Sequence, residues 1–139
     1  MKTPVCFLID DDEDDREIFM MALEKATITY SCTTANNGPD ALALLNADSD
    51  LIPDFIFVDL NMPLMHGKEC LQHIKSIPRF AGTPVIIYTT SSYEKDVDET
   101  RRLGASHFLV KPPGMGMLAK TLKRILNNDA LPYYLDGTD

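Results

Sequence analysis

The chain has 139 residues, 21 acidic and 13 basic side chains and a formal net charge of −8. This length is typical of a single domain and is sufficient to bury a core without disulfides or a structural metal. The acidic excess opposes contact with phosphate backbones and anionic lipids, so we expect protein partners, no nucleic acid and no membrane.

Short apolar runs alternate with segments whose apolar residues recur at helical spacing. The first run, residues 5–9, leads into six consecutive acids at residues 10–15, and a helical stripe at residues 18–26 follows. The second strand is the least regular, and we place it at residues 29–34, where Tyr30 and Cys32 alternate with polar residues as on an edge strand. Pro39 then suits the first turn of a second helix.

The second half repeats this alternation. Apolar runs at residues 55–58, 85–88 and 108–110 predict three more strands. A helix follows each of them: the first of these ends before Pro78, the next, at residues 93–103, is weakly packed and stopped by Gly104, and the last has a strong apolar stripe. Five strands and five helices predict an α/β fold, a flavodoxin-like doubly wound five-stranded parallel sheet in the order 2-1-3-4-5.

Polar side chains stand at the ends of four predicted strands. Asp10 and Asp11 follow the first strand, Asp59 the third, Thr89 the fourth and Lys111 the fifth. The carboxyl ends of parallel strands meet at one edge of the sheet, where open α/β folds bind ligands. We therefore expect two acids, a further acid, a hydroxyl and an amine to converge on one rim.

Three crowded carboxylates require either a raised pKa or a cation. Oxygen donors without His or Cys favour a hard ion such as Mg²⁺. An aspartate beside Mg²⁺, an amine and a hydroxyl is equipped to accept a phosphoryl group. The alternative, a structural ion pair between Asp59 and Lys111, accounts for only part of this set.

These residues and their spacing resemble the receiver domain of two-component response regulators over residues 5–126. Asp59 lies 30 positions before Thr89, and Lys111 lies 22 positions after it, with Gly104-Ala105-Ser106 between them. The resemblance implies that Asp59 is the phosphoacceptor, Thr89 the switch hydroxyl, Phe108 the switch aromatic and Lys111 the family's lysine, followed by a cis peptide bond to Pro112.

The resemblance also implies a metal site. Asp10, Asp11 and Asp59 would hold Mg²⁺ together with the backbone carbonyl of Asn61. Asp12 remains an alternative to Asp10 in the acidic pair, and the other acids of the run are interpreted as capping and solvated charges at the start of a helix. Gly67 is interpreted as supplying a backbone conformation that residues with a β-carbon resist.

The resulting hypothesis is a single-domain, CheY-like response regulator. It would take a phosphoryl group from a sensor histidine kinase or a phosphotransfer protein, catalyse only its own phosphorylation and dephosphorylation, and switch a face that binds a downstream target protein, with a homodimer also possible. A phosphatase of the haloacid-dehalogenase type would carry an acid where Asn61 stands. An unphosphorylated adaptor would not need Asp59, Thr89 and Lys111 together.

Three widely spaced cysteines, Cys6, Cys32 and Cys70, indicate reduced, mostly buried thiols and a cytoplasmic protein. We assign residues 1–128 to the receiver domain and residues 129–139 to a short tail, with no output domain. The tail contains Leu131, Tyr133, Tyr134 and Leu135, which are costly to leave in water. It is expected either to fold back over its own domain or to dock on a second copy or on the target.

Overall fold

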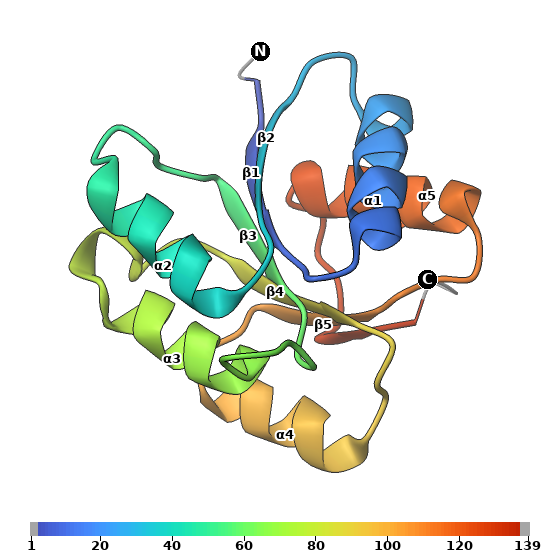
Figure 1. Ribbon diagram of the computed structural model, residues 1–139. Helices are drawn as coiled ribbons and strands as arrows, with labels where there is room; N and C mark the ends of the chain where they lie inside the picture. Colours follow the sequence, from blue (N-terminus) through green and yellow to red (C-terminus); the bar gives the residue numbers. More distant parts are fainter. Residues whose placement is uncertain (1–2, 137–139) are drawn as a thin grey trace.

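The computed structural model describes residues 3–136, which form a parallel sheet flanked by helices on both faces (Figure 1). Within these residues the sheet has six strands in the order β2-β1-β3-β4-β5-β6. Their bounds are β1 Val5–Ile9, β2 Ser31–Ala35, β3 Phe55–Val58, β4 Val85–Thr89, β5 His107–Val110 and β6 Tyr134–Leu135.

Helices cover both faces of the sheet (Figure 1). On the first face lie α1 (Glu13–Ala26) and α5 (Met115–Leu126), which pack against each other. On the second face lie α2 (Gly38–Ala47), α3 (Gly67–Ser76) and α4 (Glu94–Arg102), with a short 3-10 helix, η1, at Pro78–Phe80. The predicted doubly wound fold with five helices is confirmed.

The central strands are buried on both faces, which explains their nearly continuous apolar sequence. Every residue of β3 and β4 is buried. Side chains alternate between two cores along each strand: Phe7 and Ile9 lie in the core on the α2–α4 side, and Cys6 and Leu8 in the core on the α1–α5 side. The first polar residue after each run is thereby fixed at the carboxyl-end rim.

Local signals placed several helix ends correctly. Asp12 is the N-cap of α1, and its side chain accepts a hydrogen bond from the Asp15 backbone N–H at 3.1 Å. Pro39 lies in the first turn of α2. Gly104, with φ of 101°, follows the C-cap residue of α4 and adopts the left-handed conformation that suits glycine there.

The prediction of five strands is one short. The tail supplies β6, which pairs in parallel with β5 in the register Phe108↔Tyr134 and Leu109↔Leu135. Without β6, β5 would be an edge strand with unpaired backbone groups. In the structure the Phe108 backbone N–H donates to the Tyr133 carbonyl at 2.8 Å. The second strand also lies at Ser31–Ala35 rather than at residues 29–34.

Side chains of the tail attach it further to β5 and α4. The hydroxyls of Tyr133 and Thr100 are 2.7 Å apart, and the Arg101 guanidinium lies 5.3 Å from the centre of the Tyr133 ring. The Tyr134 ring stacks on Phe108 with centroids 6.1 Å apart, and Leu135 is buried. Of the two expected arrangements of the tail, the structure shows the fold-back; residues 137–139 lie outside the described part of the chain.

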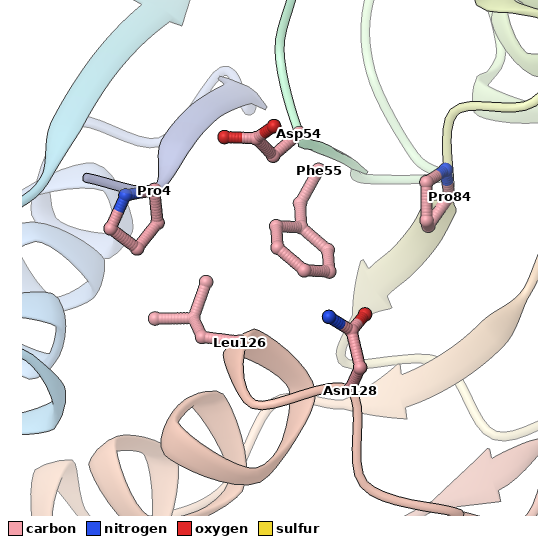
Figure 2. Close-up of a pocket in the computed structure, with 6 residues that line it drawn as sticks. All are labelled: Pro4, Asp54, Phe55, Pro84, Leu126 and Asn128. Carbon is pink, nitrogen blue, oxygen red and sulfur yellow. The ribbon is translucent and has the colours of Figure 1, made fainter. Parts of the chain in front are cut away.

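A cavity of about 310 Å³ opens at the amino ends of the strands, opposite the rim of polar residues (Figure 2). It is lined by Pro4, Asp54, Phe55, Pro84, Leu126 and Asn128. The Asp54 carboxylate accepts a hydrogen bond from the Val5 backbone N–H at 2.8 Å, so this carboxylate braces the start of β1. Over residues 3–136, none of the helices has both the length and the apolarity that crossing a membrane requires.

Candidate functional site

The predicted rim residues lie at the carboxyl ends of the strands, held there by backbone hydrogen bonds. The Asp10 N–H donates to the Ala35 carbonyl at 3.0 Å, and the Asp59 N–H donates to the Ile9 carbonyl at 2.9 Å. The Lys111 N–H donates to the Thr89 carbonyl at 2.8 Å. Each bond continues the pairing between neighbouring strands by one residue, so the sheet itself fixes where these side chains start.

The Lys111 ammonium is the centre of the site. Its Nζ lies 2.8 Å from Asp10 Oδ2, 2.7 Å from Asp15 Oδ2 and 3.4 Å from Asp59 Oδ2. The side chain of Asp10 is fully buried, and those of Lys111 and Asp59 are 9% and 10% exposed. The ammonium and two of its three carboxylates are therefore held almost out of water, whereas Asp15 is 30% exposed.

Burial and charge oppose each other in this cluster. Burial raises the pKa of Asp10, although its hydrogen bond from Lys111 acts to lower it. Burial alone would lower the pKa of Lys111, but hydrogen bonds to Asp10 and Asp15 and the charge of Asp59 outweigh burial and raise it. Lys111 is thus a permanent cation near neutral pH.

Asp10, Asp11 and Asp59 each offer a carboxylate oxygen, and these oxygens all lie within 4.8 Å of one another. Such an all-oxygen set fits a hard divalent cation such as Mg²⁺. Asp12 is occupied as the cap of α1 and donates its backbone N–H to Asp10 Oδ1 at 3.0 Å, which favours Asp10 over Asp12 in the acidic pair. Asn61 is exposed, and the role of its carbonyl stays a prediction.

The loop after Asp59 passes very close to the start of α3. The Gly67 N–H donates to the Leu60 carbonyl at 2.8 Å, and a β-carbon at Gly67 would lie only 2.2 Å from the Asp59 carbonyl oxygen. Gly67 does not have a left-handed φ, so the interpretation as a special backbone conformation is wrong. Close approach of two backbones is what requires glycine there.

Thr89 and Phe108 are both fully buried. Thr89 Oγ1 accepts a long hydrogen bond of 3.4 Å from the Ser91 backbone N–H, and Phe108 is enclosed between the core and Tyr134. The peptide bond from Lys111 to Pro112 is trans, which corrects the expected cis bond; the Lys111 side chain reaches the acids from this backbone.

The sequence alone does not single out Asp15, which it groups with the capping and solvated acids of the run. Its carboxylate makes the shortest contact to the Lys111 ammonium. A signal was present, because Asp15 lies four and seven positions before Phe19 and Ala22, on the buried stripe of α1. Asp14 shares the opposite stripe with Ile18 and Met21, which are 40% and 49% exposed.

A second missed network links the site to α4. The Ser91 hydroxyl donates to Asp96 Oδ2 at 3.2 Å, and the Lys68 ammonium lies 2.6 Å from both Asp96 Oδ1 and Glu99 Oε2. Lys68 directly follows Gly67, so it ties the loop after Asp59 to α4. Ser91, whose backbone N–H contacts Thr89, is tied to the same helix through Asp96.

The fold and the rim together define a class: a doubly wound α/β protein with an acidic pocket and a buried lysine at the carboxyl ends of its strands. The chain belongs to the response regulator receiver domain family, whose model matches residues 6–123.

Several relatives share this architecture. The chain is similar to the response regulator Rcp1 of Synechocystis, with 30% identity over 125 residues that cover 87% of this chain and 85% of Rcp1. A solved structure of Mn²⁺-bound Rcp1 matches 93% of this chain and 99% of that one, with 29% identity and a TM-score of 0.77. The solved structure of phosphorylated RcpA, a cyanobacterial phytochrome response regulator, matches 94% of this chain and 99% of its own chain, with 29% identity and a TM-score of 0.81. The structure of the chemotaxis response regulator CheY4 of Vibrio cholerae matches 89% of this chain and 99% of its own chain, with 30% identity and a TM-score of 0.77.

Proposed function

We propose that this receiver accepts a phosphoryl group on Asp59 in a Mg²⁺-dependent reaction and signals by changing the face formed by α4, β5 and the tail. The observation that carries the proposal is the convergence of Asp10, Asp11, Asp59 and Lys111 on one rim, three carboxylates near a single buried ammonium. Receiver domains are signalling proteins rather than enzymes with a separate substrate, so the reaction proposed here modifies only the chain itself.

In the proposed reaction an Asp59 carboxylate oxygen bonds to phosphorus, while the bond from phosphorus to the donor breaks and the donor takes up that electron pair. Asp59 Oδ1 accepts the Leu60 backbone N–H at 2.8 Å, which orients the carboxylate, and Oδ2 faces Lys111. Lys111 binds a phosphoryl oxygen as a point charge, and the Thr89 hydroxyl donates to another. Asp10, Asp11 and Asp59, with the Asn61 carbonyl, are the proposed ligands of Mg²⁺, which would neutralise charge on the phosphoryl group when bound.

Two relatives support this assignment, because one has been solved with a bound divalent metal and the other in a phosphorylated form. Rcp1 has been solved with Mn²⁺ and RcpA in a phosphorylated form. The donor that we propose for this chain is a sensor histidine kinase or a phosphotransfer protein. A shallow groove of about 500 Å³, lined by Glu13, Arg16, Glu17, Met20, Met21 and Thr34, runs along α1 near the rim and offers a mixed polar and apolar contact surface for that protein.

The proposed output starts at Thr89. If its hydroxyl turns to a phosphoryl oxygen, the Ser91 N–H loses its acceptor and Phe108 gains room on the same side of β4 and β5. The weakly buried α4, in which only Thr100 is buried, can then shift at low cost. A downstream protein would read this change.

Acetyl phosphate labelling tests the proposal directly. We expect peptide mass spectrometry to locate a phosphoryl group on Asp59, with loss of labelling in Asp59→Asn and on removal of Mg²⁺ by a chelator. Asp14→Asn, on the exposed stripe of α1, is the matched control and should label normally. Labelling of Asp12 or of a serine, or labelling that persists in Asp59→Asn, would contradict the assignment.

A further inference from the structure

The Lys111 ammonium has three N–H donors and three carboxylate neighbours, so its donors are all engaged. Two contacts are short, to Asp15 at 2.7 Å and to Asp10 at 2.8 Å, and the contact to Asp59 is long at 3.4 Å. The amine therefore lies closer to the acid of α1 than to the carboxylate that we propose as phosphoacceptor. None of the roles proposed above requires Asp15.

A phosphoryl group on Asp59 would change the demands on this ammonium. It brings up to two negative charges and three acceptor oxygens to the side where Lys111 now makes its longest contact. Mg²⁺, when bound, would draw charge from Asp10, but Asp15 does not belong to the group of carboxylates placed to share a metal. Asp15 would thus remain as the competitor for the amine.

We propose that Asp15 is a positioning residue that holds the Lys111 ammonium toward α1 and thereby weakens the hold of the site on a phosphoryl group at Asp59. The inference deepens the proposed function and rests on it. Asp15 contacts neither the phosphoryl group nor the metal in this assignment, and its effect passes through Lys111. The side chain of Asp15 is 30% exposed, so the expected effect is moderate.

The experiment is an equilibrium titration of the full chain with beryllofluoride, a phosphoryl mimic, at saturating Mg²⁺, followed by amide NMR shifts. We expect Asp15→Asn to bind beryllofluoride about three- to tenfold more tightly than the unchanged protein. Asp14→Asn removes the same formal charge from the adjacent, exposed position and should change affinity by less than about twofold. Asp15→Glu keeps the carboxylate and should restore the affinity of the unchanged protein.

A second readout needs neither metal nor mimic. In the metal-free protein, exchange of the Lys111 Nζ protons with water should be faster in Asp15→Asn than in Asp14→Asn, because one charged partner is lost. Equal beryllofluoride affinity in the two variants, weaker binding in Asp15→Asn, or an unchanged exchange rate would overturn the inference. If the unchanged protein itself does not bind beryllofluoride at Asp59, the proposed function fails instead, and the exchange measurement still decides whether Asp15 holds the amine.

Discussion

At the scale of single residues, the folded structure disfavours the ionised form of the Asp10 carboxyl group. Its carboxylate is fully buried, and burial raises its pKa despite the nearby Lys111 ammonium. The ionised form that a metal site requires is therefore less stable in the folded protein than in water. Such a cost is characteristic of sites kept for function rather than for stability.

We expect Asp10→Asn to raise the melting temperature of the metal-free protein by a few degrees, because the substitution removes a buried charge with little change of shape. Mg²⁺ should stabilise the unchanged protein and have a much smaller effect on the variant. Asp14→Asn is the control, since Asp14 is exposed and lies outside the carboxylate cluster, and its loss should leave the metal-free melting temperature nearly unchanged. Thermal melts with and without Mg²⁺ measure all three, and a lower melting temperature for metal-free Asp10→Asn would contradict the argument.

At the scale of elements, the tail forms part of the face that we propose as the output. Tyr133 bonds to Thr100 of α4 through its hydroxyl and accepts the Phe108 N–H through its carbonyl, so one residue joins the helix to the strand. We therefore expect a rearrangement of Phe108 to alter the tail as well, and Tyr133 and Tyr134 form part of the face that a partner would contact.

Tyr133→Phe should lower the free energy of unfolding by about 1 kcal/mol, the usual net contribution of one hydrogen bond. It should also speed amide exchange at Phe108 and Leu135, because the tail is less firmly held. Tyr93→Phe removes a hydroxyl from a side chain that is 75% exposed and serves as the matched control. Denaturant unfolding and hydrogen exchange by NMR give the two measurements, and identical behaviour of the two variants would show that the hydroxyl does not hold the tail.

Some elements of this fold can be predicted from the sequence, and others cannot. The central strands are predictable because burial on both faces demands continuous apolar runs, and the rim follows from their carboxyl ends. β6 is hidden, since two residues carry no periodic pattern and their pairing depends on an edge formed elsewhere. The contact of Asp15 with Lys111 joins residues 96 positions apart, and only the shared stripe with Phe19 hinted at it.

At the scale of the whole molecule, burial of ionisable groups sets an alkaline limit to stability. Burial raises the pKa of Cys6, Cys32 and Cys70 from 9.0 to about 12 and also raises the pKa of Tyr88, while the surrounding acids raise the pKa of Lys111 despite its burial. A folded-state pKa above the unfolded value means that stability is intact below pH 9 and falls as the pH rises toward 12. None of these groups favours unfolding near neutral pH.

We expect the urea midpoint to be constant from neutral pH to about 9 and then to fall steadily, while the urea dependence of the free energy stays the same. Native thiols should resist alkylation at pH 9 and react once the chain is unfolded. Cys32→Ala should make the alkaline fall shallower, because it removes one of the titrating groups. A midpoint that rises between pH 9 and 12 would contradict the sign of these shifts.

The late position of β6 in the chain has a consequence for synthesis. During translation the strand that it covers, β5, emerges from the ribosome together with α5 well before residues 134–135. Until those residues emerge, the nascent chain presents β5 as an open strand edge with Phe108 beside it, a surface prone to pair with other chains. We therefore expect chaperone contact and aggregation to be greatest for chains in which β5 has emerged from the ribosome and β6 has not yet paired with it, and to decline once Leu135 has joined the sheet.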